Sequence, residues 1–246
     1  MSEAISTLWE VEIRVMFSAD HWSVGENASM MNLEGHLLRC HRARSWILRA
    51  EALENNDWDT KFIAYWIAFN ALYGQAKYRW PREKRKPEED DIDALLRLVV
   101  GLDQDASVTQ ALVDLRKPVE AVVTDPFLSG SSWKVWDEHE VVDRQKRLTM
   151  AIGTPRNKTL LHRLFAALYV LRNQIFHGCS TVGSSKNRQG IEKAVVVLAR
   201  LVPTFENIVR QRGRESKLLA DPPYRPSAGS ARGLGTILER AGQRSR

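Results

Sequence analysis

Apolar residues recur at intervals of three and four over most of this chain, which is the spacing of one face of an α-helix. One helix should begin at Asp57 or Asp59, whose carboxylates can cap a helix N-terminus, and run to about residue 75. The other helices expected from this spacing cover residues 33–55, 92–100, 106–123, 158–177 and 189–211, with a weaker one over 138–150. The sequence therefore predicts an all-α, antiparallel helical bundle.

Residues 9–17 follow a different period, with apolar and polar side chains alternating one by one. Such alternation predicts a half-buried strand. A single strand needs a partner, either from a second copy of the chain or from a later short segment. Because the helical pattern starts only at Leu33, residues 1–32 are expected to form an N-terminal appendage to a helical domain over residues 33–212.

Two stretches between the expected helices have the composition of loops. Residues 77–91 contain Pro81 and Pro87 and a basic block followed by an acidic one, which predicts a solvated linker. Residues 124–135, with Pro126 and neighbouring glycine and serine, predict a second loop.

The positive charge of the chain lies at its C-terminal end. The formal net charge is +6, and residues 210–246 alone hold nine Lys/Arg and three Asp/Glu, so the rest of the chain is neutral. Proline, glycine, serine and arginine dominate residues 213–246, which predicts a disordered basic tail. The basic pI is therefore no sign that the helical body itself binds nucleic acid.

Composition excludes several classes of protein. No apolar run approaches the ~20 residues needed to cross a bilayer, and no secretory pattern opens the chain. Two cysteines, Cys40 and Cys179, do not make a disulfide framework, and no Cys/His cluster has zinc spacing. We expect a cytoplasmic protein with reduced thiols, no membrane association, no metal site and no cofactor.

The helix expected over residues 158–177 carries polar residues on an otherwise apolar surface. On a helical wheel Arg172 falls inside the apolar stripe around Leu168, while Asn173 and His177 share the far face with small apolar residues. Both faces should then be covered, one by the bundle and one by a second subunit. A structural explanation stays open: Arg172 could bridge helices through an acidic residue, and His177 could interact with the carbonyl end of its own helix.

Three separated segments of the sequence stand out together: Leu171-Arg172-Asn173-Gln174-Ile175-Phe176-His177-Gly178, the aromatic stretch over residues 62–74, and Ala43-Arg44-Ser45-Trp46 with Arg49-Ala50-Glu51. In combination they resemble one bacterial group of HEPN-domain proteins. The resemblance covers roughly residues 33–210 and leaves out the expected strand and the tail. It implies a bundle of four or five helices that pairs as a homodimer and cleaves RNA without a metal ion.

The resemblance also implies roles for individual residues. His177 would be the general base or acid, because histidine exchanges protons near neutral pH, and Arg172 would hold the phosphate. Asn173 would orient His177 or the substrate. Arg188 is a candidate second phosphate contact or else a solvated arginine. Asn70 could bond into the Arg172 cleft or satisfy a nearby backbone group.

The partners that the resemblance implies are RNA, a second copy of the chain, and an antitoxin or another protein of a bacterial defence system. The expected products are a 2′,3′-cyclic phosphate and a 5′-hydroxyl end. Two alternatives compete with an endoribonuclease. One is a non-catalytic HEPN module that binds RNA, a nucleotide or a protein, and the other is a purely structural helical protein.

A row of residues in the first expected helix offers a second basic surface. Arg39, Arg42, Trp46 and Arg49 share one face at helical spacing. Such a row could follow a phosphate backbone and stack a base, or it could be a solvated face whose tryptophan seals a contact between helices.

Overall fold

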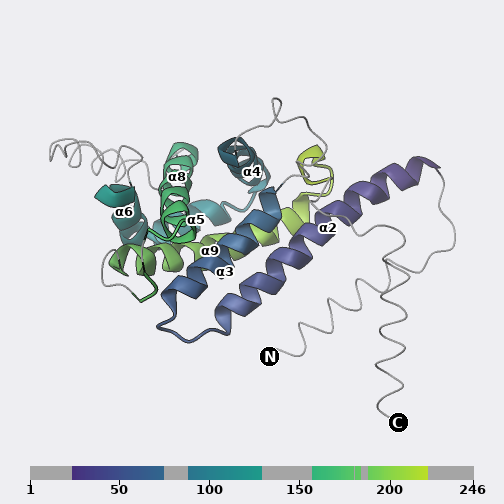
Figure 1. Ribbon diagram of the computed structural model, residues 1–246. Coiled ribbons are helices and arrows are strands. Elements are labelled where there is room, and N and C mark those ends of the chain that lie inside the picture. The colour runs from purple at the N-terminus through teal and green to yellow at the C-terminus, as the bar shows by residue number, and fades with distance from the viewer. Residues whose placement is uncertain (1–23, 75–87, 129–156, 180, 184–187, 221–246) are drawn as a thin grey trace, which may run out of the picture.

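The computed structural model describes residues 24–74, 88–128, 157–179, 181–183 and 188–220. Within these ranges the chain forms seven α-helices and two short 3-10 helices, and no strand (Figure 1). The fold is thus all-helical, as expected. The strand expected over residues 9–17 and the helix expected over 138–150 lie outside the described residues. The elements are α2 (Val24–Glu51), α3 (Trp58–Tyr73), α4 (Glu88–Leu102), α5 (Ser107–Asp114), α6 (Arg116–Thr124), η3 (Pro126–Leu128), α8 (Asn157–Phe176), α9 (Arg188–Arg212) and η4 (Lys217–Leu219).

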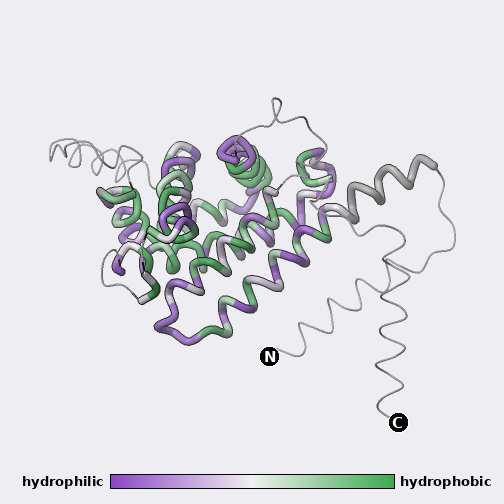
Figure 2. The backbone as a smooth tube through the Cα atoms, viewed as in Figure 1, coloured by the Kyte–Doolittle hydropathy of each residue, from purple (hydrophilic) through white to green (hydrophobic). Residues whose placement is uncertain are grey.

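Helix α9 is the central element of the bundle. It contacts α2, α3, α4, α5 and α6, while α2 and α3 pack side by side as a hairpin. Helices α4 and α8 contact each other and stand across the long axis of α9 in Figure 1. Apolar positions, green in Figure 2, recur along the packed helices, and most of them are buried in this interior.

Aromatic side chains lock α8 against its neighbours. The rings of Phe69 in α3 and Phe165 in α8 lie 4.5 Å apart, and Phe165 lies 5.6 Å from Phe205 in α9. One turn further along α8, Tyr169 lies 6.2 Å from Trp66 of α3. These contacts fix both the position and the rotation of α8, and so determine which way its last turn faces.

The ends of α3 and α8 follow the capping rules. Asp57 caps α3, accepting a hydrogen bond from the backbone N–H of Thr60 at 3.2 Å. Gly178 ends α8 in the left-handed conformation, at φ 69°, which glycine adopts readily at the end of a helix. The backbone N–H of Cys179 then donates to the carbonyl of Gln174 at 2.8 Å, which closes the helix end.

Two expectations about element boundaries were wrong. The acidic residues 88–91, assigned to a linker, form the first turn of α4, where the positive end of the helix dipole favours acidic side chains. The single helix expected over residues 106–123 is broken at Leu115 into α5 and α6. Pro118 accounts for the break, because it has no N–H to donate to the carbonyl four residues earlier.

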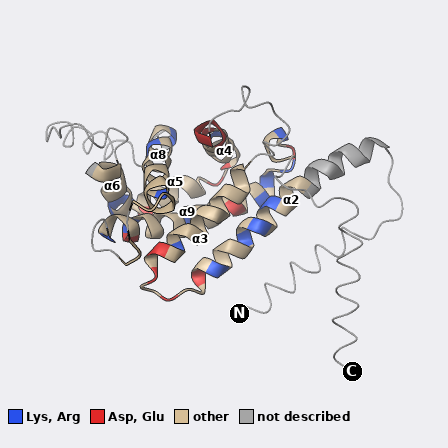
Figure 3. Ribbon diagram, in the orientation of Figure 1, with Lys and Arg blue, Asp and Glu red and all other residues tan. Residues whose placement is uncertain are grey.

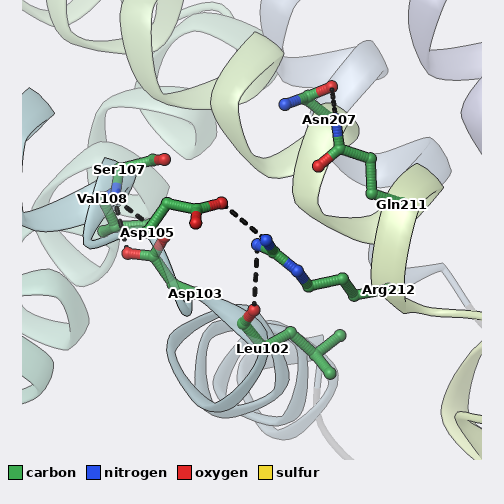
Figure 4. Close-up of polar contacts among 8 residues, drawn as sticks. All are labelled: Leu102, Asp103, Asp105, Ser107, Val108, Asn207, Gln211 and Arg212. Carbon is green, nitrogen blue, oxygen red and sulfur yellow. Dashed lines mark hydrogen bonds and ion pairs between the residues drawn. The ribbon is translucent and has the colours of Figure 1, made fainter.

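Polar contacts tie the end of α9 to the connection between α4 and α5 (Figure 4). Asp103 accepts hydrogen bonds at 2.8 Å from the backbone N–H groups of Ser107 and Val108 and so caps α5. Arg212 bridges to Asp105 at 2.6 Å and donates to the carbonyl of Leu102 at 3.5 Å. The C-terminal end of α4 is thereby held against α9.

The ordered packing continues past the end of α9. Leu219 is fully buried, and η4 contacts both α2 and α3. Gly35 of α2 permits this contact, because a Cβ atom at that position would overlap the backbone carbonyl of Ala220. Helix α2 begins at Val24, upstream of Leu33. The division into appendage, domain and tail stays a prediction. None of the described helices is long and apolar enough to cross a membrane.

Candidate functional site

Arg172 lies in the last turns of α8 with its guanidinium between aromatic rings and polar groups. Its Nη1 donates to Oδ1 of Asn173 at 2.8 Å, and its Nη2 lies 3.9 Å from Oε2 of Glu88. The guanidinium carbon is 4.9 Å from the centre of the Phe176 ring and 5.8 Å from that of Tyr169. The side chain is 21% exposed, so it is mostly buried but still reachable from solvent.

One edge of this guanidinium has no close hydrogen-bond acceptor. The Nε atom is buried and makes no hydrogen bond within the part of the chain that the structure describes. The adjacent Nη2 is too far from Glu88 for a normal hydrogen bond. Nε and Nη2 together form the fork of donors with which arginine binds the two oxygens of a carboxylate or phosphate.

Glu88 is held near Arg172 by two tyrosines. The hydroxyl of Tyr73 donates to Oε1 of Glu88 at 2.6 Å, and the hydroxyl of Tyr169 lies 3.4 Å from Oε2. Burial, and next the hydrogen bond to Glu88, raises the pKa of Tyr73 above its usual range. Burial followed by the charges of Glu88 and Glu89 also raises the pKa of Tyr169. Both phenols therefore stay protonated and remain donors.

His177 lies just beyond the end of α8 and is exposed. Its backbone N–H donates to the carbonyl of Asn173 at 3.0 Å. No hydrogen bond or ion pair connects its imidazole with Arg172 or Asn173. The structure therefore brings Arg172 and Asn173 together, and leaves His177 on the surface one turn away.

The two tentative substrate-binding residues lie elsewhere. Arg188, the first residue of α9, is paired with Asp59 at 2.9 Å, and Asp59 also accepts from the backbone N–H of Gly183 at 3.2 Å. Arg188 therefore ties the start of α9 to the start of α3. Asn70 is half-buried in α3, and no described residue forms a hydrogen bond with its side chain. A role for either residue in substrate binding stays a prediction.

The expected basic row on the first helix is interrupted. Arg39 is fully buried, and its guanidinium donates to the carbonyls of Leu219 at 3.1 Å, Leu72 at 3.1 Å and Gly74 at 2.6 Å. Trp46 is 39% exposed and Arg49 lies on the surface. Arg39 thus secures the C-terminal end of α3 and cannot meet a phosphate backbone.

Acidic residues of α4 line a groove between α4 and α8. A groove of about 320 Å³ between α4 and α8 is lined by Glu89, Asp90 and Asp93, together with His162 and apolar residues of both helices. Figure 3 shows this concentration of acidic residues on α4. The carboxylates of these acidic residues make the groove unfavourable for an anion.

Sequence reasoning missed Glu88, Tyr73 and Tyr169. Tyr73 and Tyr169 fit into apolar helical patterns, and Glu88 stood within an apparent linker. The acidic run after Pro87 was the available signal, because acidic residues that follow a proline are typical of a helix N-terminus.

Among the described residues, no group of three or more His, Cys, Asp or Glu side chains is arranged to hold a metal ion. In comparisons with known proteins, no family model, no curated protein and no solved structure matches this chain.

Proposed function

We propose that this protein is a metal-independent endoribonuclease of the HEPN type, with Arg172, Asn173 and His177 at its active site. The observation that carries the proposal is the state of Arg172. Its guanidinium is preorganised by Asn173 and Phe176, its side chain is 21% exposed, and its buried Nε has no acceptor among the described residues. Preorganised donors with spare capacity are what stabilisation of a phosphorane-like transition state requires.

The reaction assigned to this site is attack of a ribose 2′-oxygen on the adjacent phosphorus. The bond from phosphorus to the 5′-oxygen breaks, the 2′-hydroxyl loses its proton, and the leaving 5′-oxygen gains one. His177 serves as the general base or the general acid, since imidazole does either near neutral pH. Arg172 holds the phosphate oxygens and stabilises the charge that gathers on them. The products are a 2′,3′-cyclic phosphate and a 5′-hydroxyl end.

Two copies of the chain supply the site in this proposal. Ala166 of α8 and His177 just beyond its end are exposed, and Phe176 is 47% exposed. A second α8 packed there would cover this surface and bring a second His177 toward the first. One histidine could then act as the base and the other as the acid.

The test is RNA cleavage in the presence of EDTA by wild type, Arg172→Ala and His177→Ala. We expect losses of at least 100-fold in kcat for each variant, because each removes a charge-stabilising or proton-transferring group. Arg163→Ala, an exposed arginine on the same helix, is the matched control and should retain activity. Mass spectrometry of the products should show the cyclic phosphate. Equal cleavage by all four proteins would reject the mechanism.

One observation favours the second candidate, a non-catalytic HEPN module that binds RNA, a nucleotide or a protein partner. Arg172 already lies near an internal carboxylate, that of Glu88, as in a structural ion pair. This candidate predicts binding of RNA that weakens in Arg172→Ala without any cleavage by wild type.

A further inference from the structure

The polar cluster around Arg172 contains an internal anion at the place where a substrate anion would bind. The carboxylate of Glu88 is fixed by Tyr73 at 2.6 Å and by Tyr169 at 3.4 Å, and one of its oxygens faces Nη2 of Arg172 at 3.9 Å. Arg172 is itself held by Asn173 through its other terminal nitrogen. The two charges are therefore kept close together but not in full contact.

We infer that the Nε–Nη2 edge of Arg172 is an oxyanion site, and that Glu88 is a built-in competitor for it. The identification of the oxyanion as an RNA phosphodiester rests on the proposed function. A carboxylate at 3.9 Å attracts the guanidinium without using its donors, so it opposes the entry of a second anion by charge repulsion. Glu88 thus sets the affinity of the site for phosphate and is a positioning residue, not a catalytic one.

Three features of the cluster favour competition between Glu88 and a bound anion over a simple structural ion pair of Glu88 with Arg172. A structural arginine–carboxylate pair normally closes to 2.7–2.9 Å, with parallel hydrogen bonds. Here the distance is longer, and the buried Nε has no acceptor in the described part of the chain, a state that costs about 1–3 kcal/mol in general. The hydroxyl of Tyr73 binds Oε1 of Glu88, the carboxylate oxygen that does not face Arg172, and so restrains the carboxylate from moving toward Arg172.

The test measures binding without requiring cleavage. The probe is a short, fluorescein-labelled single-stranded RNA with 2′-O-methyl riboses, which lack the attacking hydroxyl, and its affinity is read by fluorescence anisotropy with the full chain. Glu88→Gln keeps an acceptor for Tyr73 but removes the charge. Glu89→Gln is the matched control, because Glu89 is exposed on the same turn and has the same charge.

We expect Glu88→Gln to bind the RNA about three- to fivefold more tightly than Glu89→Gln, the range for a partly exposed ion pair. This gain in affinity should vanish in the Arg172→Ala background. Its loss there distinguishes binding at Arg172 from nonspecific binding by the basic tail. In a cleavage assay Glu88→Gln should lower KM and leave kcat unchanged.

Equal or weaker binding by Glu88→Gln overturns the inference, as does a gain that persists without Arg172 or an absence of RNA binding by Glu88→Gln. Failure of the proposed function looks different. Glu88→Gln would then tighten binding through Arg172 while no variant cleaves unmodified RNA. Thermal unfolding of each variant shows that the fold is retained.

Discussion

Two arginines of this bundle, Arg39 and Arg172, show how different a buried guanidinium can be. Arg39 in α2 is fully buried, and carbonyls of α3, Gly74 and Leu219 surround it at hydrogen-bonding distance. Arg172 in α8 is 21% exposed, bonds to one neutral oxygen, and keeps a buried Nε without an acceptor in the described residues. The first is saturated by the fold, and the second is left with capacity to bind.

The two arginines differ in how many of their donors the fold supplies with partners. A charge taken out of water is tolerated when the fold supplies partners in its place, as the C-terminal carbonyls of α3 do for Arg39. Arg172 receives fewer partners than it has donors. A stability requirement alone would favour closing its gap to Glu88, so the open donor edge is the better indicator of a ligand.

Replacement of Arg39 should have the largest effect on stability. Arg39→Met leaves the carbonyls of Leu72, Gly74 and Leu219 buried without a donor, and we expect a loss of about 3–5 kcal/mol in the free energy of unfolding. Urea denaturation followed by circular dichroism measures it. A loss below about 1 kcal/mol would mean that the hydrogen bonds from Arg39 to these carbonyls contribute little to stability.

Gly35→Ala should act on the same region with a smaller effect. The added Cβ overlaps the carbonyl of Ala220 and must displace η4, which we expect to lower stability by about 1–3 kcal/mol. Tryptic cleavage after Lys217 should accelerate. Gly101→Ala is the control: its Cβ meets nothing within 4 Å, so that variant should be as stable as wild type or more so. Similar behaviour of the two variants would contradict the close packing of η4.

Replacement of Arg172 should barely change stability. For Arg172→Met we expect a change within about 1 kcal/mol, because its ion pair is long and partly exposed. The methionine side chain can still pack against Phe176 and Tyr169. The contrast with Arg39→Met, measured in the same urea titration, is the direct test of the comparison. A loss as large as that of Arg39→Met would make Arg172 a structural residue.

The smallest expected effect is on the pH dependence of stability and involves His36. Its Nε2 donates to the carbonyl of Arg210 at 3.0 Å, close to Arg39. Burial, and less strongly the charges of Arg210, Arg214 and Arg39, lowers the pKa of His36. The unfolded chain then binds more protons, so stability should fall as pH drops through about 6.5 toward the folded pKa. His36→Gln should flatten this dependence between pH 7.5 and 5.5. If the free energy of unfolding of His36→Gln depended on pH as steeply as that of wild type, other groups would cause the dependence.

Much of the helical architecture could be predicted from the sequence, because apolar spacing and capping residues act locally. The core stripe of α8 was expected from the helical wheel, and Leu161, Leu164, Phe165, Leu168 and Leu171 are all buried. Asp57 and Gly178 end their helices as their chemistry requires. The break between α5 and α6 could also have been found, since Pro118 is a local signal.

The candidate site was only half visible in the sequence. Arg172 and His177 stood out as polar residues at the end of an apolar helix, but the residues that define the state of Arg172 come from α3 and α4. Glu88 is far from Arg172 along the chain, and no periodicity connects them. Arg39 was likewise expected in a surface row, although helical spacing does not tell which face of α2 is covered by η4.

The sequence by itself determined where helices form and which of their faces are apolar, because backbone propensity and side-chain periodicity are properties of neighbouring residues. Only the tertiary structure decided which polar side chains receive partners. That outcome depends on how distant helices pack, and here it saturates Arg39 with carbonyls while leaving Arg172 3.9 Å from a carboxylate that two tyrosines bind. Whether a guanidinium is saturated depends on that packing, which is why arginine is saturated at one position of this bundle and not at another.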